Sequence, residues 1–408
     1  MANQTRIYGD LKVTLTSDYN WLWSDKGTGA EKAATFWHPK SQSGDFGGMR
    51  PLGSVGTNHY NDINKKQATL LVGATSNSNP AVKSPTDYTQ IWISQGMGGI
   101  YDNSTWRPIP PPGYVSMGDV VFDCTKTSWD QKPSTNLVWC LRADLAKRAI
   151  YGATSFWDDV KGGGLYDCSV WQAVPEPVVG NGDKNIPITA GTFRASPSYS
   201  KPDSSQALVP ILSCENQFKR FDAPVPKITP STIPSTGDQF SLSEQCRITL
   251  PFTSFFESTN ERCLDFIQDP FIELSRSIAW RTEGVWVNGS GGAYSRQKEI
   301  KYGVSKEQSE SMTHSAGVEV SASAGIGCAS FSVSLNYQFT YQSNSSSTEF
   351  SESTVTEKFE VPGKNATVLF SKHIWITAAR TNDGPVMEQI ELVANDDVYF
   401  AGCLVASE

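Results

Sequence analysis

The chain has 408 residues, of which 19% are charged, and its formal net charge is -8. An acidic chain without a cluster of Lys and Arg is a poor binder of nucleic acid, so we expect no nucleic-acid partner. It also gains nothing from attraction to anionic lipid, so a membrane would have to be reached through a specific receptor.

Residues 1–20 contain Arg6, Asp10 and Lys12 and no apolar core, and no stretch of 18 apolar residues exists in the chain. A secretory signal requires an apolar core of about 7–15 residues, and a transmembrane helix requires about 20 apolar residues. We therefore expect a protein that is made in soluble form without a classical signal peptide. The 33 Gly, 23 Pro and 12 Trp residues favour an all-β fold with many short strands and tight turns.

The first half of the chain contains an internal repeat of three copies. The landmark tryptophans Trp37, Trp106 and Trp171 lie 69 and 65 residues apart, and a Gly-rich turn precedes each of them. A single copy cannot bury its apolar face alone, so the three copies should close around a pseudo-threefold axis. This predicts a β-prism, with a β-trefoil as the second candidate, since the repeat is somewhat long for a trefoil.

Residues 106–118 read Trp-Arg-Pro-Ile-Pro-Pro-Pro-Gly-Tyr-Val-Ser-Met-Gly. This run resembles the W-x-P-x-P-P-x-G-Y-x-x-L/M-G signature of the vacuolar protein sorting-associated protein 62 family. The resemblance covers about residues 15–215, and the signature is looser in the first and third copies. It implies a fold more than a function, because the activity of that family is poorly defined.

The segment from Phe221 to Gly237 is rich in Pro, Ser and Thr and has no apolar periodicity, which is typical of a linker between domains. We therefore divide the chain into a triplicated β-prism-like receptor-recognition domain, residues 1–221, and a second β module, residues 222–408. Strand-like pieces of that module are expected at 247–252, 278–287, 358–361, 366–370, 374–378, 386–393 and 398–404.

Two amphipathic arms stand out in the second half. From Lys301 to Thr356, 20 of 56 residues are Ser or Thr, and residues 316–341 hold a single charge, Glu319. Apolar residues alternate with small polar ones in both arms, 316–326 and 331–341, and the parity changes between the arms. The change of parity predicts a turn or bulge at 327–330.

Each arm is 11 residues long, and a strand that crosses a bilayer needs roughly 9–11. Several copies would have to close into a ring, because a lone hairpin leaves backbone groups unpaired in lipid. The residues expected to face lipid are Val318, Val320, Ala322, Ala324, Ile326, Phe331, Val333, Leu335, Tyr337, Phe339 and Tyr341. The same alternation also occurs in half of an ordinary sandwich sheet, and that alternative stays open.

This pattern is similar to the insertion hairpin of aerolysin-type β-pore-forming toxins, and the flanking Ser/Thr-rich stretches are similar to the long stem strands of those toxins. The resemblance covers about residues 240–405. It implies an elongated aerolysin-like pore-forming module that acts extracellularly as a homo-oligomer on the target membrane. The plan of a lectin-like domain joined to such a module also occurs in insecticidal proteins.

Asp25, Trp37, Trp106 and Trp171 are candidate receptor-binding residues. A carboxylate beside an aromatic face suits a sugar, because the ring stacks on C–H faces while the carboxylate accepts hydroxyl groups. The alternative is that the aspartate caps a turn and the tryptophans belong to the core. A cell-surface carbohydrate is therefore one candidate receptor.

No arrangement of residues in the sequence indicates catalysis. The four histidines, His38, His59, His314 and His373, form no known catalytic or metal-binding motif, and the eight cysteines contain no C-x-x-C. We expect no enzyme activity, no metal and no cofactor, and mostly reduced, buried thiols. Two functions remain: a receptor-dependent pore former, or a non-lytic lectin-like or trafficking-associated binding protein.

Overall fold

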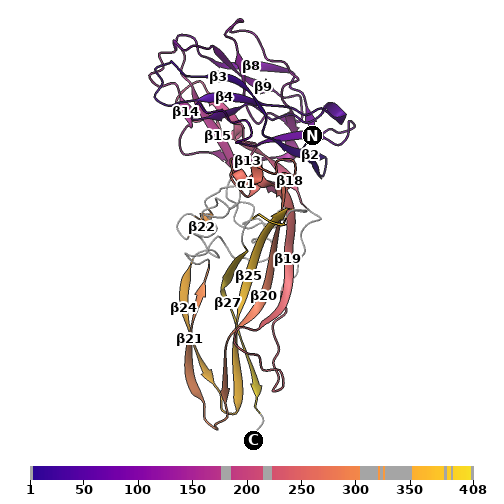
Figure 1. The fold of residues 1–408 in the computed structure, drawn as a ribbon, viewed down its shortest axis with the longest axis vertical. Helices are drawn as coiled ribbons and strands as arrows, with labels where there is room; N and C mark the ends of the chain where they lie inside the picture. Colours follow the sequence, from indigo (N-terminus) through magenta and orange to yellow (C-terminus); the bar gives the residue numbers. More distant parts are fainter. Residues whose placement is uncertain are drawn as a thin grey trace.

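The computed structural model describes residues 3–175, 185–214, 223–303, 320–321, 325–326, 352–380, 384–386 and 389–405. The molecule is elongated, with an N-terminal domain (the head, residues 3–214) at one end and long strands that run away from it toward the C-terminus (Figure 1). The all-β fold with a pseudo-threefold head and an elongated module is confirmed.

Each of the three repeats forms a three-stranded antiparallel sheet whose central strand carries the landmark tryptophan. These sheets are β3 (Tyr19–Ser24), β4 (Thr35–Pro39) and β5 (Val55–Thr57); β8 (Asp87–Ile93), β9 (Asn103–Ile109) and β11 (Val120–Asp123); and β14 (Trp157–Asp158), β15 (Ser169–Pro175) and β17 (Phe193–Ser196). The three sheets have the same strand order along the chain, so the spacing of the tryptophans predicted the repeat correctly.

A second, outer pair of strands ties the beginning of each repeat to its end. These pairs are β2 (Leu11–Thr16) with β6 (Thr69–Ala74), β7 (Val82–Lys83) with β12 (Cys140–Arg142), and β13 (Ala146–Tyr151) with β18 (Leu208–Ser213). The short strands β1 (Arg6–Tyr8), β10 (Tyr114–Val115) and β16 (Asn185–Pro187) extend them, and the 3-10 turns η1 (Asp45–Gly47), η2 (Ala143–Leu145) and η3 (Ser204–Gln206) lie between strands. Each repeat therefore closes on itself.

Three tryptophans lock the repeats together at the centre of the head. The ring centroids of Trp23, Trp92 and Trp157 lie 5.6–5.9 Å apart. Each indole N–H donates to a backbone carbonyl of the next repeat: Trp23 to Tyr101, Trp92 to Tyr166, and Trp157 to Lys32. This cyclic arrangement makes the three repeats one cooperative core.

Close backbone approach on the pseudo-threefold axis explains one pair of glycines. A Cβ on Gly53 would lie 2.7 Å from the Cα of Gly118, which is closer than real Cβ contacts. The residues that follow them hydrogen-bond across the axis, from Ser54 N to Asp119 O and from Asp119 N to Phe193 O, both at 2.9 Å. Glycine is required here because any side chain would separate the repeats.

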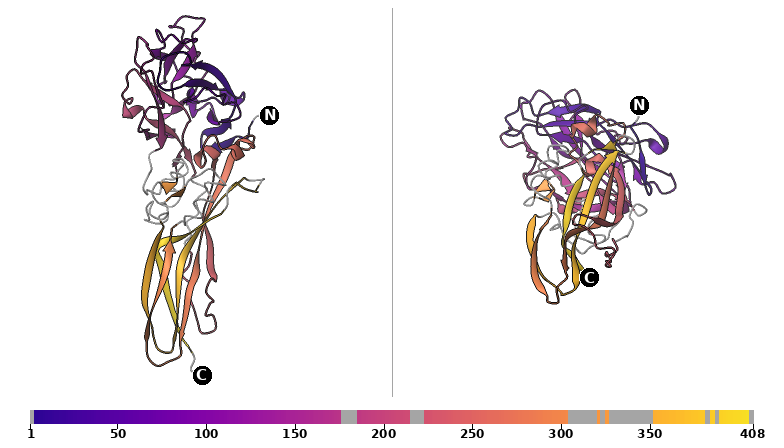
Figure 2. Two further views of the ribbon diagram at one scale, coloured as in Figure 1. Left: turned by 60° about the vertical axis from the view of Figure 1, so that its left-hand side comes forward. Right: turned by 60° about the horizontal axis from the view of Figure 1, so that its bottom comes forward.

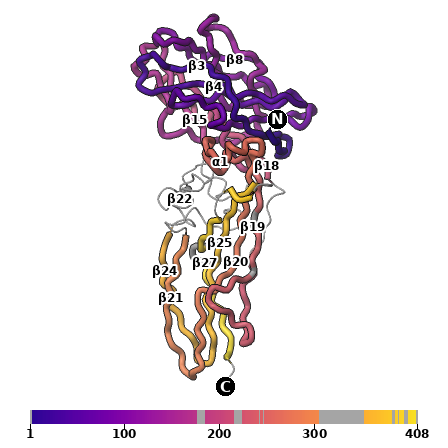
Figure 3. The backbone as a smooth tube through the Cα atoms, in the orientation of Figure 1, coloured from indigo at the N-terminus to yellow at the C-terminus, as the bar shows by residue number. Residues whose placement is uncertain are grey.

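The second half is built on a long antiparallel sheet (the long sheet). Its strands in spatial order are β19 (Gln239–Pro251), β20 (Phe271–Asn288), β25 (Asn365–Arg380) and β27 (Ile390–Leu404), with β26 (Gly384–Pro385) beside the end of β25. Figure 3 shows how these strands run together along the module. Along β20, buried residues alternate with partly exposed ones, as expected when one face of a sheet covers a core.

A separate two-stranded sheet (the ribbon) lies beside the long sheet, as the two views of Figure 2 also show. It consists of β21 (Tyr294–Tyr302) and β24 (Ser353–Val361), paired over nine residues from Tyr294↔Val361 to Tyr302↔Ser353. Most ribbon residues are exposed. Two short strands follow in the chain, β22 (Val320–Ser321) and β23 (Gly325–Ile326), which pair with each other.

Residues 252–270 (the collar) join the head to the long sheet. The collar contains η5 (Phe252–Ser254) and the helix α1 (Glu261–Leu264). Phe252, Phe255 and Phe256 are buried, and they belong to one apolar cluster that continues from the head into the long sheet. The two halves therefore share a packed core rather than a bare linker.

The predicted domain boundary at 221/222 lies outside the described residues; β18 ends at Ser213 and β19 begins at Gln239. Within the part of the chain that the structure describes, no helix has the length and apolar character to cross a membrane. Cys124, Cys140 and Cys263 are free thiols in buried positions.

Candidate functional site

The four residues predicted to contact a receptor lie inside the head. Trp37, Trp106 and Trp171 are 4%, 3% and 5% exposed, and Asp25 is 2% exposed. The Asp25 carboxylate accepts hydrogen bonds from Ala34 N and from the Trp157 indole, both at 2.9 Å. Direct contact of these residues with a sugar stays a prediction, and their burial indicates that they support the fold.

Asp25 instead identifies three equivalent loops at one end of the head. Asp25, Ser94 and Asp159 occupy matching positions, and each side chain accepts a hydrogen bond from the backbone N–H nine residues later, at Ala34, Asn103 and Cys168. We call residues 25–34, 94–103 and 159–168 the apical loops. Each is closed by an equivalent bond between its two ends, which fixes the shape of the loop.

Large apolar side chains are exposed on two of the apical loops. Ile100 and Tyr101 are 67% and 38% exposed, and Leu165 and Tyr166 are 67% and 54% exposed. Exposed apolar residues that recur at equivalent positions favour binding of a partner. These residues were not among the sites predicted from the sequence, although an apolar pair directly after the Gly-rich turn of the second and third copies was the available signal.

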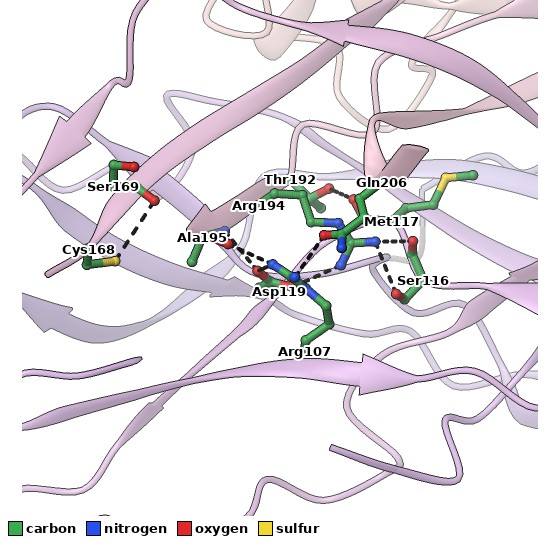
Figure 4. Close-up of polar contacts among 10 residues, drawn as sticks. All are labelled: Arg107, Ser116, Met117, Asp119, Cys168, Ser169, Thr192, Arg194, Ala195 and Gln206. Atoms are coloured by element: carbon green, nitrogen blue, oxygen red, sulfur yellow. Dashed lines mark hydrogen bonds and ion pairs between the residues drawn. The ribbon is translucent and has the colours of Figure 1, made fainter. Parts of the chain in front are cut away.

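A buried ionic network joins the second and third repeats (Figure 4). Asp119 is fully buried, and it accepts hydrogen bonds from Arg107 Nε and Nη2 at 2.9 and 2.8 Å, from Arg194 Nη1 at 2.9 Å and from Ala195 N at 2.8 Å. Burial alone would raise the pKa of Asp119, but the two guanidinium groups outweigh it and lower that pKa. The arrangement is structural, since both oxygens of the Asp119 carboxylate accept hydrogen bonds from within the head.

The first repeat has a neutral pair in the same position. His38 stands where Arg107 stands in the second repeat, and its Nδ1 lies 3.4 Å from Ser54 Oγ, which replaces the Asp119 carboxylate. Burial lowers the pKa of His38 to about 4. This histidine is therefore neutral at physiological pH. The first repeat thus has a neutral pair at the position where the second repeat has an ion pair.

The ribbon is the part of the structure that borders the predicted insertion segment. Its ends, Tyr302 and Ser353, face each other, so the chain between them leaves and returns at one point. Ile300 and Tyr302 are buried against Leu369 of the long sheet, and Phe359 packs on Trp286 with ring centroids 4.6 Å apart. Beyond Tyr302, Gly303 N donates to Val393 O at 3.0 Å.

Most of the predicted insertion residues lie outside the described residues; only Val320 and Ile326 are placed. These two pair with each other across β22 and β23, so the chain reverses between Ser321 and Gly325. The predicted arm 316–326 is thus not one straight strand in this structure.

One charged cluster holds three strands of the long sheet together. His373 on β25 is 5% exposed; its Nδ1 lies 2.8 Å from Glu391 on β27, and its Nε2 lies 3.2 Å from Glu283 on β20. Burial alone would lower the pKa of His373, but the hydrogen bonds to both carboxylates outweigh it and raise that pKa. The hydrogen bond from His373 lowers the pKa of Glu391.

We expect the long sheet to lose stability as the pH rises. A raised His373 pKa stabilises the fold fully below the unfolded value, about 6.5, and this contribution disappears as the pH passes the folded value. His373→Gln should cost about 3 kcal/mol at pH 5.5, because two carboxylates lose their shared cation. The difference between wild type and variant, measured by urea unfolding, should shrink as the pH rises above about 6.5. A difference that is independent of pH would show that His373 is neutral.

Among the described residues, no group of His, Cys, Asp and Glu is arranged to hold a metal ion. The fold and its surfaces define an all-β protein of two parts, in which a pseudo-threefold β-prism-like head carries an elongated β module. The head also places the chain in a known family. The family model of vacuolar protein sorting-associated protein 62 matches residues 1–229, and the chain belongs to this family.

Three solved structures are similar to parts of the chain. GNIP1Aa from Chromobacterium piscinae matches at 20% identity and a TM-score of 0.39. The match covers 50% of this chain and 37% of that one. Cry35Ab1 matches at 11% identity and a TM-score of 0.34, over 97% of this chain and 90% of that one. The oligomeric pore-forming toxin pro-Monalysin matches at 8% identity and a TM-score of 0.21, over 33% of this chain and 63% of that one. No curated protein matches the chain.

Proposed function

We propose that this protein is a receptor-dependent β-pore-forming toxin, insecticidal or otherwise cytolytic, and not an enzyme. The head binds a cell-surface receptor, several copies assemble on the target membrane, and residues 316–341 enter the lipid as an amphipathic hairpin. The protein acts from outside the target cell. The observation that carries the proposal is the ribbon, because its paired strands begin and end the amphipathic segment at one point.

The balance of apolar burial supports insertion. Detaching the ribbon exposes a small contact, chiefly Ile300 and Tyr302 on Leu369 and Phe359 on Trp286. The second arm offers five large side chains to lipid: Phe331, Val333, Leu335, Tyr337 and Phe339. Each large side chain that passes from water into lipid contributes about 1.5–3 kcal/mol, which favours insertion. Backbone groups must still be paired in lipid, which requires a closed ring of copies.

A second candidate function is a non-lytic, lectin-like or trafficking-associated binding protein. The pairing of Val320 with Ile326 favours it, because that reversal interrupts the first arm. In this case the second half is only a scaffold that carries the head. The two candidates differ in one respect: both bind cells, and only the first makes membranes leak.

Release of a trapped dye separates the two candidates. Vesicles prepared from membranes of susceptible cells are loaded with calcein, and vesicles of phosphatidylcholine alone serve as the control without a receptor. We expect the full chain to release calcein from the first and not from the second. Binding to the cell-derived vesicles without release would refute pore formation and favour the binding protein.

A further inference from the structure

The three junctions between repeats at the apical loops are built on equivalent positions but filled differently. At each junction, a residue two positions before the central tryptophan faces the loop of the next repeat. The pairs are Trp21 and Tyr101, whose rings are in contact, Gln90 and Tyr166, which line one groove, and Ser155 and Lys32, which are hydrogen-bonded. The same bond from the central tryptophan to a carbonyl of the next repeat forms at all three junctions, and the side chains beside it differ.

Two of the junctions are closed. The Trp21 and Tyr101 rings meet edge to face with centroids 4.6 Å apart. Lys32 reaches across the other junction to Ser155 Oγ at 3.0 Å and forms an ion pair with Asp158. An aromatic contact fills the first junction and a salt bridge fills the third.

The junction between the second and third repeats is open. Gln90 is shorter than the tryptophan it replaces, and its amide donates to Trp129 O at 2.7 Å. A groove of about 460 Å³ remains, lined by residues 90–93 of β8, by Leu165, Tyr166 and Asp167, and by Pro197. The volume lies within the usual range of small-ligand sites, about 300–1,000 Å³.

The lining of this groove suits a sugar ring. Leu165 and Tyr166 offer exposed apolar surface, 67% and 54% exposed, against which the C–H face of a pyranose can stack. The Asp167 carboxylate can accept hydrogen bonds from hydroxyl groups, and it is oriented by Tyr199, whose hydroxyl donates to Oδ1 at 3.1 Å. No Lys or Arg is among the described residues that line the groove, which disfavours an anionic ligand.

We propose that the groove between the second and third repeats binds a pyranose ring of a cell-surface glycan. The proposal rests on the receptor-binding role of the head given under the proposed function. It assigns the contact to Tyr166, Leu165 and Asp167 rather than to the buried tryptophans. It also explains why one of three equivalent junctions is open while the other two are filled.

The groove can be closed by copying the first junction. Gln90→Trp places an indole opposite Tyr166, as Trp21 stands opposite Tyr101, and Trp21→Gln is the matched control at the closed junction. Binding of methyl glycosides of galactose, mannose and N-acetylglucosamine to the full chain is measured by calorimetry. We expect at least one glycoside to bind, Gln90→Trp to weaken it about tenfold or more, and Trp21→Gln to leave it unchanged.

Tyr166→Ala serves as a second variant if Gln90→Trp fails to fold, and it should weaken binding by a similar factor, with Tyr101→Ala as its control. Unchanged glycoside affinity in a folded Gln90→Trp protein would overturn the proposal, as would binding of choline or lysine in place of every glycoside. Calcein release separates this failure from that of the proposed function. Lysis by a chain that binds none of the glycosides refutes the sugar groove and leaves the pore former in place.

Discussion

Leu335→Arg is expected to abolish membrane permeabilisation while leaving cell binding unchanged. Leu335 lies outside the described residues, and it stands in the middle of the second arm, where the alternation directs it to lipid. A charge near the bilayer midplane costs about 2–4 kcal/mol in a membrane barrel. Every protomer of a ring bears that cost, so the total rises with the number of copies. Calcein release from target-cell vesicles measures the effect.

Asn336→Arg is the matched control, because it places the same charge one residue further on, on the face directed to the aqueous lumen. This variant should still permeabilise vesicles and should shift the ion selectivity of the channel toward anions. Equal loss of lysis in both variants would contradict the assigned faces. If Leu335→Arg still lyses vesicles, the arm 331–341 does not enter the membrane.

Asp119→Asn is expected to destabilise the head by about 3–5 kcal/mol, because it leaves the buried Arg194 and the partly buried Arg107 facing a neutral amide. Arg194 is 3% exposed in its side chain and Arg107 is 20% exposed, so water cannot replace the lost carboxylate. The free energy of unfolding of the full chain, measured in guanidinium chloride by tryptophan fluorescence, reports this loss. The network joins two repeats, so we also expect a less cooperative transition.

Asp87→Asn is the control for this prediction. Asp87 pairs with Lys132 at the surface, and both side chains are about half exposed, at 51% and 50%. Exposed pairs of this kind contribute little to stability. An unchanged denaturation midpoint is therefore expected. A loss of stability as large as that of Asp119→Asn would show that removing any carboxylate destabilises the head. The buried network would then contribute no more to stability than a surface ion pair.

The repeat and its symmetry could be read from the sequence, because tryptophans and Gly-rich turns recur at fixed spacing. The long strands were predicted only in pieces. Residues 366–370 and 374–378 were separated at Ser371, Lys372 and His373, and these polar residues lie inside the continuous strand β25. Ser371 and His373 are satisfied by Glu283 on the neighbouring strand. The hydropathy of one strand does not show which residues on the neighbouring strand will pair with its polar side chains.

The collar and the open groove could not be predicted for a related reason. Phe255 and Phe256 are buried because the head covers them, and Ala68 N of the head donates to Ser258 O. To predict the groove, one must compare Gln90 with Trp21, and this requires knowing which residue each one faces. The ribbon was also predicted only in part. Residues 358–361 of β24 were expected to form a strand, but β21 was not, because its mostly polar and charged residues form no apolar run.

The most direct test of pore formation holds the ribbon on the long sheet. Gly303 and Val393 form an antiparallel β-bridge, whose Cα atoms are typically about 4.5–5.5 Å apart, within the range of a disulfide. The double variant Gly303→Cys/Val393→Cys is compared with each single variant, which also controls for the strain of a side chain at the positive φ of Gly303. Channel conductance in bilayers made with target-cell lipid and receptor extract is recorded before and after reduction.

We expect the oxidised double variant to bind these membranes without conductance, and to form channels once it is reduced. The single variants should form channels in both conditions. Channels of normal conductance from the fully oxidised double variant would contradict release of the ribbon and insertion of residues 316–341.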